Sequence, residues 1–271
     1  MKPTNPIGVF DSGVGGLSVL HEIRRALPGE DLLYVADSGH APYGDKSQPF
    51  IEARSIAITE FLVSQQAKAI VVACNTATGA AVATLRSKFH MPIIAMEPAV
   101  KPAAENTKSG VVGVMATSRT LVSDNFVKLF ARYGEEARIL GQACPGLVEK
   151  VEAGDLSGDK TRLLLEGYVL PLLEQGADTI VLGCTHYPFL APLIQKIAGP
   201  EVAVIDSAAA VARQLRRRLE VADLLADAGR IGTECFWTSG VLDKAKPLVS
   251  QLWKANVEVR ALPAGAGYKP E

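Results

Sequence analysis

Two stretches of this sequence, Ala69-Ile-Val-Val-Ala-Cys-Asn-Thr-Ala77 and Thr179-Ile-Val-Leu-Gly-Cys-Thr-His-Tyr187, follow one pattern. In each, an apolar run of strand length leads into a cysteine and hydroxyl-bearing or amide residues, and a helical stretch is expected next. A short run that is apolar throughout is typical of a strand in a parallel sheet with helices on both faces. The pair of stretches therefore predicts an α/β fold with two similar halves.

The alternation of strands and helices continues outward from both stretches. We expect strands at 7–10, 32–36, 69–73, 92–96, 111–115, 137–140, 179–182 and 202–205, and helices such as 17–27, 49–66, 78–89, 124–133, 160–175 and 208–219. This order predicts two doubly wound parallel-sheet domains related by a pseudo-twofold duplication, with the active site in the cleft between them. The expected domains are 1–97 plus 208–271, and 98–207.

Composition narrows the class of protein. The 271 residues include 28 basic and 29 acidic ones, and a net charge of −1 argues against a nucleic-acid partner. No apolar run approaches the ~20 residues of a membrane span, and no signal-peptide core is expected at the N-terminus. The four cysteines form no CxxC pair, so neither a disulfide scaffold nor a zinc site is expected. We expect a soluble, cytoplasmic protein.

Polar side chains follow five of the expected strands, at the edge where open parallel sheets bind ligands. They lie in Asp11–Gly16, Asp37 with 42–44, 74–76, 117–118 and 184–186. The glycine loop does not fit a dinucleotide, because Ser18 occupies the third glycine position and Asp11 would repel a pyrophosphate. Its N–H groups, at the start of a helix, would suit a small carboxylate instead.

Cys74 and Cys184 each follow a strand, and each is expected to begin a helix, whose dipole lowers a thiol pKa from about 8.5. Two such thiols from facing halves suggest two acid/base groups that approach one carbon from opposite sides and invert it. Asp11 and His186 could each manage the proton of one thiol. Cys144 and Cys235 lack this setting, and we expect them to be buried structural thiols.

Six segments of the chain resemble, in the same order, the cofactor-independent enzymes of the aspartate/glutamate racemase superfamily, and the members that act on glutamate are the nearest match. The segments are 7–18, 37–44, 71–78, 143–148, 183–188 and 205–207, and the resemblance covers residues 7–212. It implies interconversion of L- and D-glutamate by a two-cysteine, two-base proton transfer that supplies D-glutamate for peptidoglycan synthesis, with no cofactor and no metal. A homodimer is expected.

The resemblance also assigns roles to residues. Cys74 would deprotonate D-glutamate and Cys184 L-glutamate, with Asp11 and His186 as further catalytic residues. The substrate would be held by Asp11, Ser12, Tyr43, Gly44, Asn75, Thr76, Thr117, Thr185 and His186, with Glu152 as a further candidate.

Two other functions stay open. An aspartate racemase or a related amino-acid racemase would keep both cysteines. A non-catalytic two-lobed binding protein for a small ligand would share the two halves, although it has no need for a reactive thiol in each lobe. Replacing either cysteine separates these classes, because a binding protein would keep its affinity.

Overall fold

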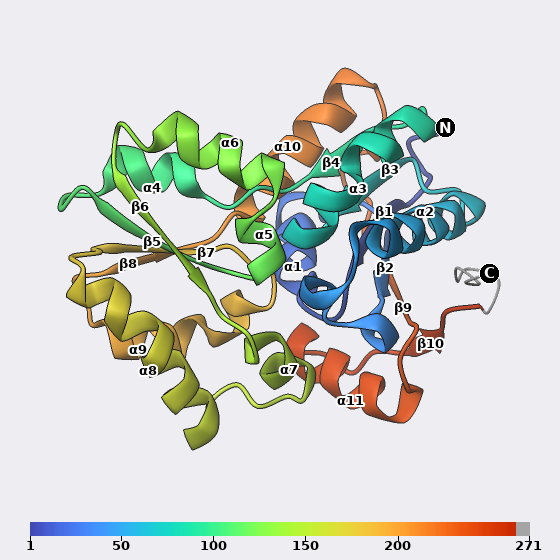
Figure 1. Ribbon diagram of the computed structural model, residues 1–271. Helices are drawn as coiled ribbons and strands as arrows, with labels where there is room; N and C mark the ends of the chain where they lie inside the picture. The colour runs from blue at the N-terminus through green and yellow to red at the C-terminus, as the bar shows by residue number, and fades with distance from the viewer. Residues whose placement is uncertain (264–271) are drawn as a thin grey trace. The chain divides into compact units, whose positions relative to one another are not determined.

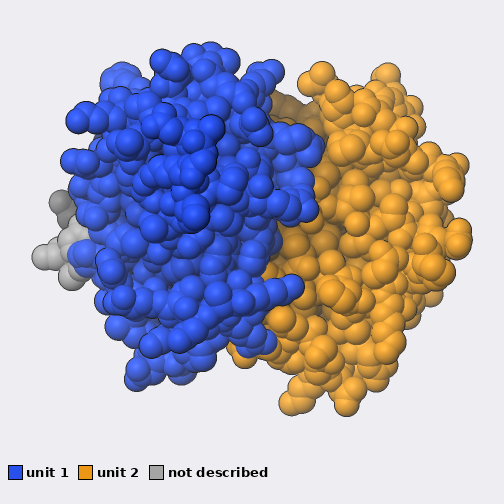
Figure 2. All heavy atoms as spheres, turned by 180° about the vertical axis from the view of Figure 1, so that it is seen from behind, with its two compact units in different colours: residues 1–96, 208–271 blue, residues 97–207 orange. Residues whose placement is uncertain are grey.

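The computed structural model describes residues 1–263, which form two compact units (Figure 2). Unit 1 comprises the chain up to Met96 and from Ala208, and unit 2 comprises Glu97–Ser207. Each unit is built on one parallel sheet with helices on both faces (Figure 1). The predicted α/β class with two parallel-sheet domains is confirmed. None of the helices within residues 1–263 is long and apolar enough to cross a membrane.

Unit 1 contains a six-stranded sheet in the order β10-β9-β2-β1-β3-β4. Its strands are β1 (Ile7–Asp11), β2 (Leu32–Ala36), β3 (Ala69–Val72), β4 (Ile93–Ala95), β9 (Glu234–Thr238) and β10 (Val259–Ala261). Its α-helices are α1 (Leu17–Ala26), α2 (Gln48–Ser64), α3 (Asn75–Lys88), α10 (Ala208–Val221) and α11 (Leu242–Trp253), with short 3-10 helices η1 (Ser38–His40) and η2 (Tyr43–Asp45). Helices α2 and α3 pack together, as do α1 and α10.

Unit 2 contains a four-stranded sheet in the order β6-β5-β7-β8. Its strands are β5 (Val111–Ala116), β6 (Arg138–Ala143), β7 (Thr179–Leu182) and β8 (Ala203–Ile205). Its helices are α4 (Val100–Asn106), α5 (Ser118–Leu121), α6 (Asp124–Tyr133), α7 (Leu147–Glu152), α8 (Asp159–Glu174), η3 (Tyr187–Leu190) and α9 (Ala191–Ala198). Helix α4 packs with α6, and α8 packs with α9 (Figure 1).

The two sheets share one strand connectivity. The order β2-β1-β3-β4 in unit 1 is matched by β6-β5-β7-β8 in unit 2, so that β3 corresponds to β7. In each sheet the second strand of the unit lies on one side of the first strand, and the third strand lies on the other side of it. Right-handed crossovers put the helices of these two connections on opposite faces of the sheet. The loops after β1 and β3, and after β5 and β7, therefore diverge, which is where doubly wound sheets open a ligand crevice.

The structure differs from the expected strands at three places. The strand expected at 137–140 is β6, which continues to Ala143. Strands β9 and β10, which extend the first sheet beyond β2, were not among those predicted. Strand β8, which lies in the expected strand 202–205, is apolar like the buried parallel strands, but Ala203 is exposed and Val204 and Ile205 are only half-buried. The reason is its place at the end of the sheet, where it has a neighbouring strand on one side only.

Candidate active site

In unit 1, a line of hydrogen bonds joins the ends of β1 and β3. The Cys74 thiol donates to Ser12 Oγ at 3.7 Å, and the Ser12 hydroxyl donates to Asp11 Oδ1 at 3.4 Å. All three side chains are buried, and they lie at the carboxyl ends of β1 and β3, from which the chain leads to opposite sides of the sheet. A carboxylate therefore reaches the thiol through a single hydroxyl group, and this arrangement can pass a proton.

The Asp11 carboxylate is held by the glycine loop. Its Oδ2 accepts hydrogen bonds from the Gly16 N–H at 2.9 Å and the Gly13 N–H at 3.3 Å. A Cβ at position 16 would lie 2.7 Å from the Cβ of Asp11, so only glycine fits there. The expectation that these N–H groups would receive an external carboxylate is wrong for Gly13 and Gly16, because the side chain of Asp11 already occupies them.

Cys74 is the N-cap residue of α3, as predicted. Its sulfur accepts a hydrogen bond from the Ala77 N–H at 3.4 Å. Positive partial charge at a helix start and a backbone donor both stabilise a thiolate, so the setting favours ionisation of Cys74.

The amide of Asn75 lies next to this thiol without a protein partner. Both Oδ1 and Nδ2 of Asn75 are buried and have no hydrogen-bond partner within residues 1–263. Ser207 Oγ, which follows β8 in unit 2, is also buried with no hydrogen-bond partner among these residues. An unpaired buried amide costs about 1–3 kcal/mol, which a bound polar ligand would recover. Asn75 is thus well suited to bind a carboxylate, and Thr76 is buried beside it.

Tyr43 and Gly44 lie on the loop after β2, which packs against α3. The Tyr43 hydroxyl donates to Asp37 Oδ2 at 2.6 Å, and burial together with the Asp37 charge raises the pKa of Tyr43 well above its usual value. Arg54 donates to both oxygens of Asp37. Arg54 was not among the residues predicted for the site, although it occupies the buried face of α2 between Ile51 and Ile58, where an arginine is unusual.

In unit 2, a thiol, an imidazole and a carboxylate are aligned. Cys184 Sγ lies 3.8 Å from His186 Nδ1, and His186 Nε2 lies 2.8 Å from Glu152 Oε1 at the end of α7. Because Glu152 accepts from the Nε2–H, the neutral imidazole presents its Nδ1 lone pair to the thiol. His186 can therefore take the proton of Cys184, and Glu152 stabilises the imidazolium that forms. The structure gives the candidate residue Glu152 a specific partner.

Cys184 does not begin an α-helix, and that prediction is wrong. The residues after it form a turn in which the Tyr187 N–H donates to the Cys184 carbonyl oxygen at 3.1 Å. A 3-10 helix follows, and α9 begins only at Ala191. One cause is Pro188, which lacks the N–H that would donate to the Cys184 carbonyl oxygen in an α-helix, so that the Tyr187 N–H takes this place and the turn is of the 3-10 type. The imidazole of His186, rather than a helix dipole, is the group that can stabilise the Cys184 thiolate.

The remaining predicted residues make capping contacts or are buried in the core. Thr117 follows β5 and caps α5, where its Oγ1 accepts from the Thr120 N–H at 3.2 Å. Thr185 is buried beside Cys184. Cys144 is buried, as expected, and burial together with the nearby Cys184 charge raises its thiol pKa. Cys235 is half-buried on β9 rather than fully buried.

Each unit thus gathers one part of the predicted site at the carboxyl edge of its own sheet. Unit 1 holds Asp11, Ser12, Tyr43, Gly44, Cys74, Asn75 and Thr76, and unit 2 holds Thr117, Glu152, Cys184, Thr185 and His186. Within residues 1–263, no group of three or more His, Cys, Asp or Glu side chains could hold a metal ion.

Comparison with known proteins identifies the family and the fold. The family model described as Asp/Glu/Hydantoin racemase matches residues 7–215. A glutamate racemase from Methylococcus capsulatus is 56% identical over 96% of this chain and 96% of its own length. Among solved structures, a glutamate racemase isoform from Bacillus anthracis has a TM-score of 0.86 at 33% identity, covering 96% of this chain and 98% of its own. The Escherichia coli glutamate racemase in complex with L-glutamate and activator UDP-MurNAc-ala has a TM-score of 0.82 at 33% identity, covering 95% and 97%. With a thiol after the corresponding strand of each sheet, and with a family match over most of its length, the chain belongs to the Asp/Glu/Hydantoin racemase family.

Proposed function

We propose that this protein interconverts L-glutamate and D-glutamate with Cys74 and Cys184 as the two bases. One observation carries the proposal: corresponding strands of two sheets with the same connectivity each end in a thiol that has its own proton-handling partners. The high identity to proteins named glutamate racemase supports glutamate as the substrate.

The proposed reaction is a transfer of two protons at one carbon. With L-glutamate, the Cys184 thiolate takes the α-proton, so that the C–H bond breaks and an S–H bond forms. The carbanion then receives the proton of the Cys74 thiol on its other face. In this proposal, His186 with Glu152 exchanges a proton with the Cys184 thiol, and Ser12 with Asp11 exchanges a proton with the Cys74 thiol.

Substrate binding in this proposal uses the polar groups around the two thiols. The unpaired amide of Asn75 is suited to the α-carboxylate. We assign the other contacts, following the family resemblance, to Asp11, Ser12, Tyr43, Gly44, Thr76, Thr117, Thr185 and His186. Because two thiols act as base and acid, the reaction needs no electron sink, and EDTA or hydroxylamine is expected to leave the rate unchanged.

Deuterium incorporation tests the two-base mechanism. In D2O, early in the reaction from L-glutamate, the D-glutamate product should carry deuterium at Cα, and the recovered L-glutamate should carry almost none. A single base that exchanges with solvent would label both enantiomers. Equal labelling of substrate and product by mass spectrometry would therefore refute two bases.

Circular dichroism tests the substrate. The purified protein, incubated separately with L-glutamate and L-aspartate, should abolish the signal of glutamate only. Loss of the aspartate signal alone would assign the protein to aspartate racemisation. Binding of glutamate without any loss of signal would instead indicate a binding protein.

We also propose a biological setting. D-glutamate would supply peptidoglycan synthesis, which complementation of a D-glutamate auxotroph tests. A cytoplasmic location suits four cysteines that are all free, since thiols stay reduced there. A homodimer is our proposal for the assembly, and exposed apolar side chains such as Val127 and Phe130 on α6 offer surface for it. Sedimentation velocity would test it.

A further inference from the structure

A buried cluster of charged and polar side chains lies beneath the loop that carries Tyr43 and Gly44. Asp37, Tyr43 and Arg54 are each at most 2% exposed. Asp37 Oδ2 accepts from the Tyr43 hydroxyl at 2.6 Å and from Arg54 Nε at 2.9 Å, while Oδ1 accepts from Arg54 Nη2 at 2.6 Å. His40 Nδ1 lies 3.0 Å from Oδ1. One carboxylate therefore ties together β2, the loop and α2.

Asp37 and Arg54 form a buried ion pair at the centre of this cluster. Burial alone would raise the pKa of Asp37, but the hydrogen bonds from His40 and Arg54 outweigh it, and the pKa lies below its ordinary value. The two parallel bonds from Arg54 form a bidentate pair, whose planar geometry a lysine cannot reproduce. This geometry fixes the orientation of the Asp37 carboxylate, and therefore of the Tyr43 ring that donates to it.

The loop is fixed at a second point by the end of β9. The Gly39 N–H donates to Ser239 Oγ at 3.1 Å, and a Cβ on Gly39 would lie 2.6 Å from the Ser239 carbonyl oxygen. The 3-10 helix η2, which includes Tyr43 and Gly44, packs against α3, whose N-cap residue is Cys74. Tyr43 and Cys74 also belong to one cluster of buried residues. The position of Gly44 relative to the thiol thus depends on the anchors.

The geometry points to Arg54 and Asp37 as positioning residues that hold the Tyr43–Gly44 loop in place against Cys74. This role rests on the proposed function, in which Tyr43 and Gly44 contact glutamate. Arg54 acts at a distance, because its guanidinium is bound to Asp37 rather than aimed at the thiol. Loosening the pair would move the loop, and a displacement of about 1 Å at a reacting centre can cost about 100-fold in rate.

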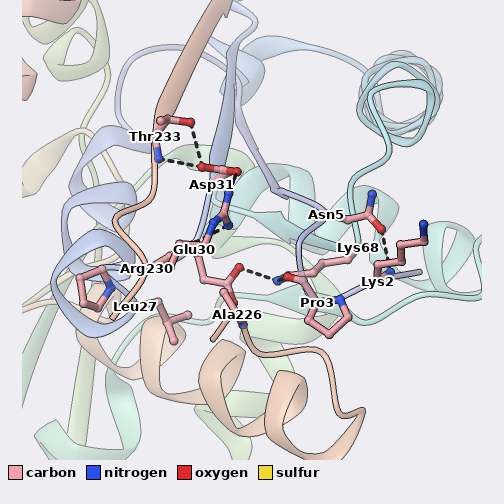
Figure 3. Close-up of polar contacts among 12 residues, drawn as sticks. Lys2, Pro3, Asn5, Leu27, Glu30, Asp31, Lys68, Ala226, Arg230 and Thr233 are labelled. Atoms are coloured by element: carbon pink, nitrogen blue, oxygen red, sulfur yellow. Dashed lines mark hydrogen bonds and ion pairs between the residues drawn. The ribbon is translucent and has the colours of Figure 1, made fainter. Parts of the chain in front are cut away.

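A second buried ion pair in unit 1 provides a matched control. Lys68 Nζ donates to Glu30 Oε2 at 2.5 Å, and Glu30 Oε1 accepts from the Ala226 N–H at 2.9 Å (Figure 3). Both side chains are at most 2% exposed, like those of the Arg54 pair. However, Glu30 and Lys68 precede β2 and β3, so they lie at the opposite edge of the sheet from Cys74.

The test compares Arg54→Lys and Tyr43→Phe with Glu30→Gln. We expect Arg54→Lys to lower kcat/KM for glutamate about 100-fold, with KM raised for both enantiomers. Tyr43→Phe keeps the ion pair but removes the hydroxyl through which the pair holds the loop. It serves if Arg54→Lys does not fold, and we expect it to lower kcat/KM about 10-fold and to speed amide exchange in the loop; unchanged exchange would contradict the positioning role. Glu30→Gln should lower the melting temperature and leave kcat and KM within about 2-fold.

Amide hydrogen exchange in residues 38–46 gives a readout that does not need activity. Exchange should be at least about 10-fold faster in Arg54→Lys, and unchanged in Glu30→Gln. Unchanged exchange in Arg54→Lys, or an equal loss of kcat/KM in Glu30→Gln, would overturn the positioning role. A wild-type protein that does not racemise glutamate would contradict the proposed function, while exchange would still decide whether the ion pair holds the loop.

Discussion

Replacing Glu152 with glutamine tests how the proton of Cys184, the thiol in unit 2, is accepted. Glutamine keeps the size of the side chain and removes its charge. The Glu152 carboxylate lies 2.8 Å from Nε2 of His186, whose other nitrogen faces Cys184 Sγ at 3.8 Å. The variant therefore removes the group that stabilises a protonated His186, and His186 becomes a weaker acceptor for the Cys184 proton.

The geometry sets the size of the effect. A hydrogen bond to a charged group contributes about 1.5–3 kcal/mol. The His186 side chain is 1% exposed and that of Glu152 is 18% exposed, so solvent screens the pair little, and the upper part of that range applies. Since about 1.36 kcal/mol corresponds to a tenfold change in rate, we expect kcat/KM to fall about 100-fold.

The assay uses the symmetry of the reaction. Enantiomers have equal free energy in water, so kcat/KM must fall by the same factor in both directions. The deuterium isotope effect can still differ, because it reports which proton transfer limits the rate. We expect the effect in Glu152→Gln to grow with L-glutamate deuterated at Cα, whose deuteron Cys184 removes, and to grow less with the D-enantiomer. A fall in kcat/KM of less than about 3-fold, or an isotope effect that grows only with D-glutamate, would refute the reasoning.

Three further outcomes follow from the structure. Glu30→Gln leaves the Lys68 charge buried without its counter-ion and should cost about 3–5 kcal/mol of unfolding free energy in urea titrations; removing both charges with apolar residues should recover most of it. Burial would raise the pKa of Asp178, but hydrogen bonds from Thr107 and two backbone N–H groups outweigh it and lower this pKa to about 2. Asp178→Asn should therefore reduce the free energy of unfolding by about 1–2 kcal/mol above pH 4. The difference from wild type should shrink as the pH falls towards 2. Saturating glutamate should slow alkylation of Cys74 and Cys184 by iodoacetamide, and mapping of the labelled peptides would contradict the site if neither is protected.

Several central strands of the two sheets could be predicted because their sequences are apolar throughout. Leu32–Ala36 and Thr179–Leu182 were predicted with the bounds that the structure has. Strand β9, Glu234–Thr238, was missed because it begins with a charged residue and its first two residues are only half-buried. Its strand character depends on pairing with β2, a contact between residues about 200 positions apart.

Some features of the site could likewise be predicted from local sequence, whereas others depend on contacts between distant parts of the chain. The position of Cys74 at a helix start follows from local sequence. The partner of His186 does not, since Glu152 lies on a helix from another part of the chain. Arg54 escaped prediction because an arginine within a helix usually faces solvent, and only the fold shows that it is paired with Asp37. Pro188 was the sequence signal against an α-helix at Cys184, because proline lacks the N–H that such a helix would need at that position.

The two halves share a topology, yet their thiols work in different surroundings. Cys74 accepts a hydrogen bond from the first turn of α3 and contacts a serine, whereas Cys184 faces an imidazole backed by a carboxylate. A helix start stabilises the thiolate by a fixed field, while an imidazole must itself take up the proton. Nothing requires the two thiols to be equally basic, because the equilibrium between enantiomers fixes only the ratio of kcat/KM in the two directions. Different surroundings must then appear in the separate values of kcat and KM for each enantiomer. A change confined to one half should alter those values unequally and still leave kcat/KM equal in the two directions.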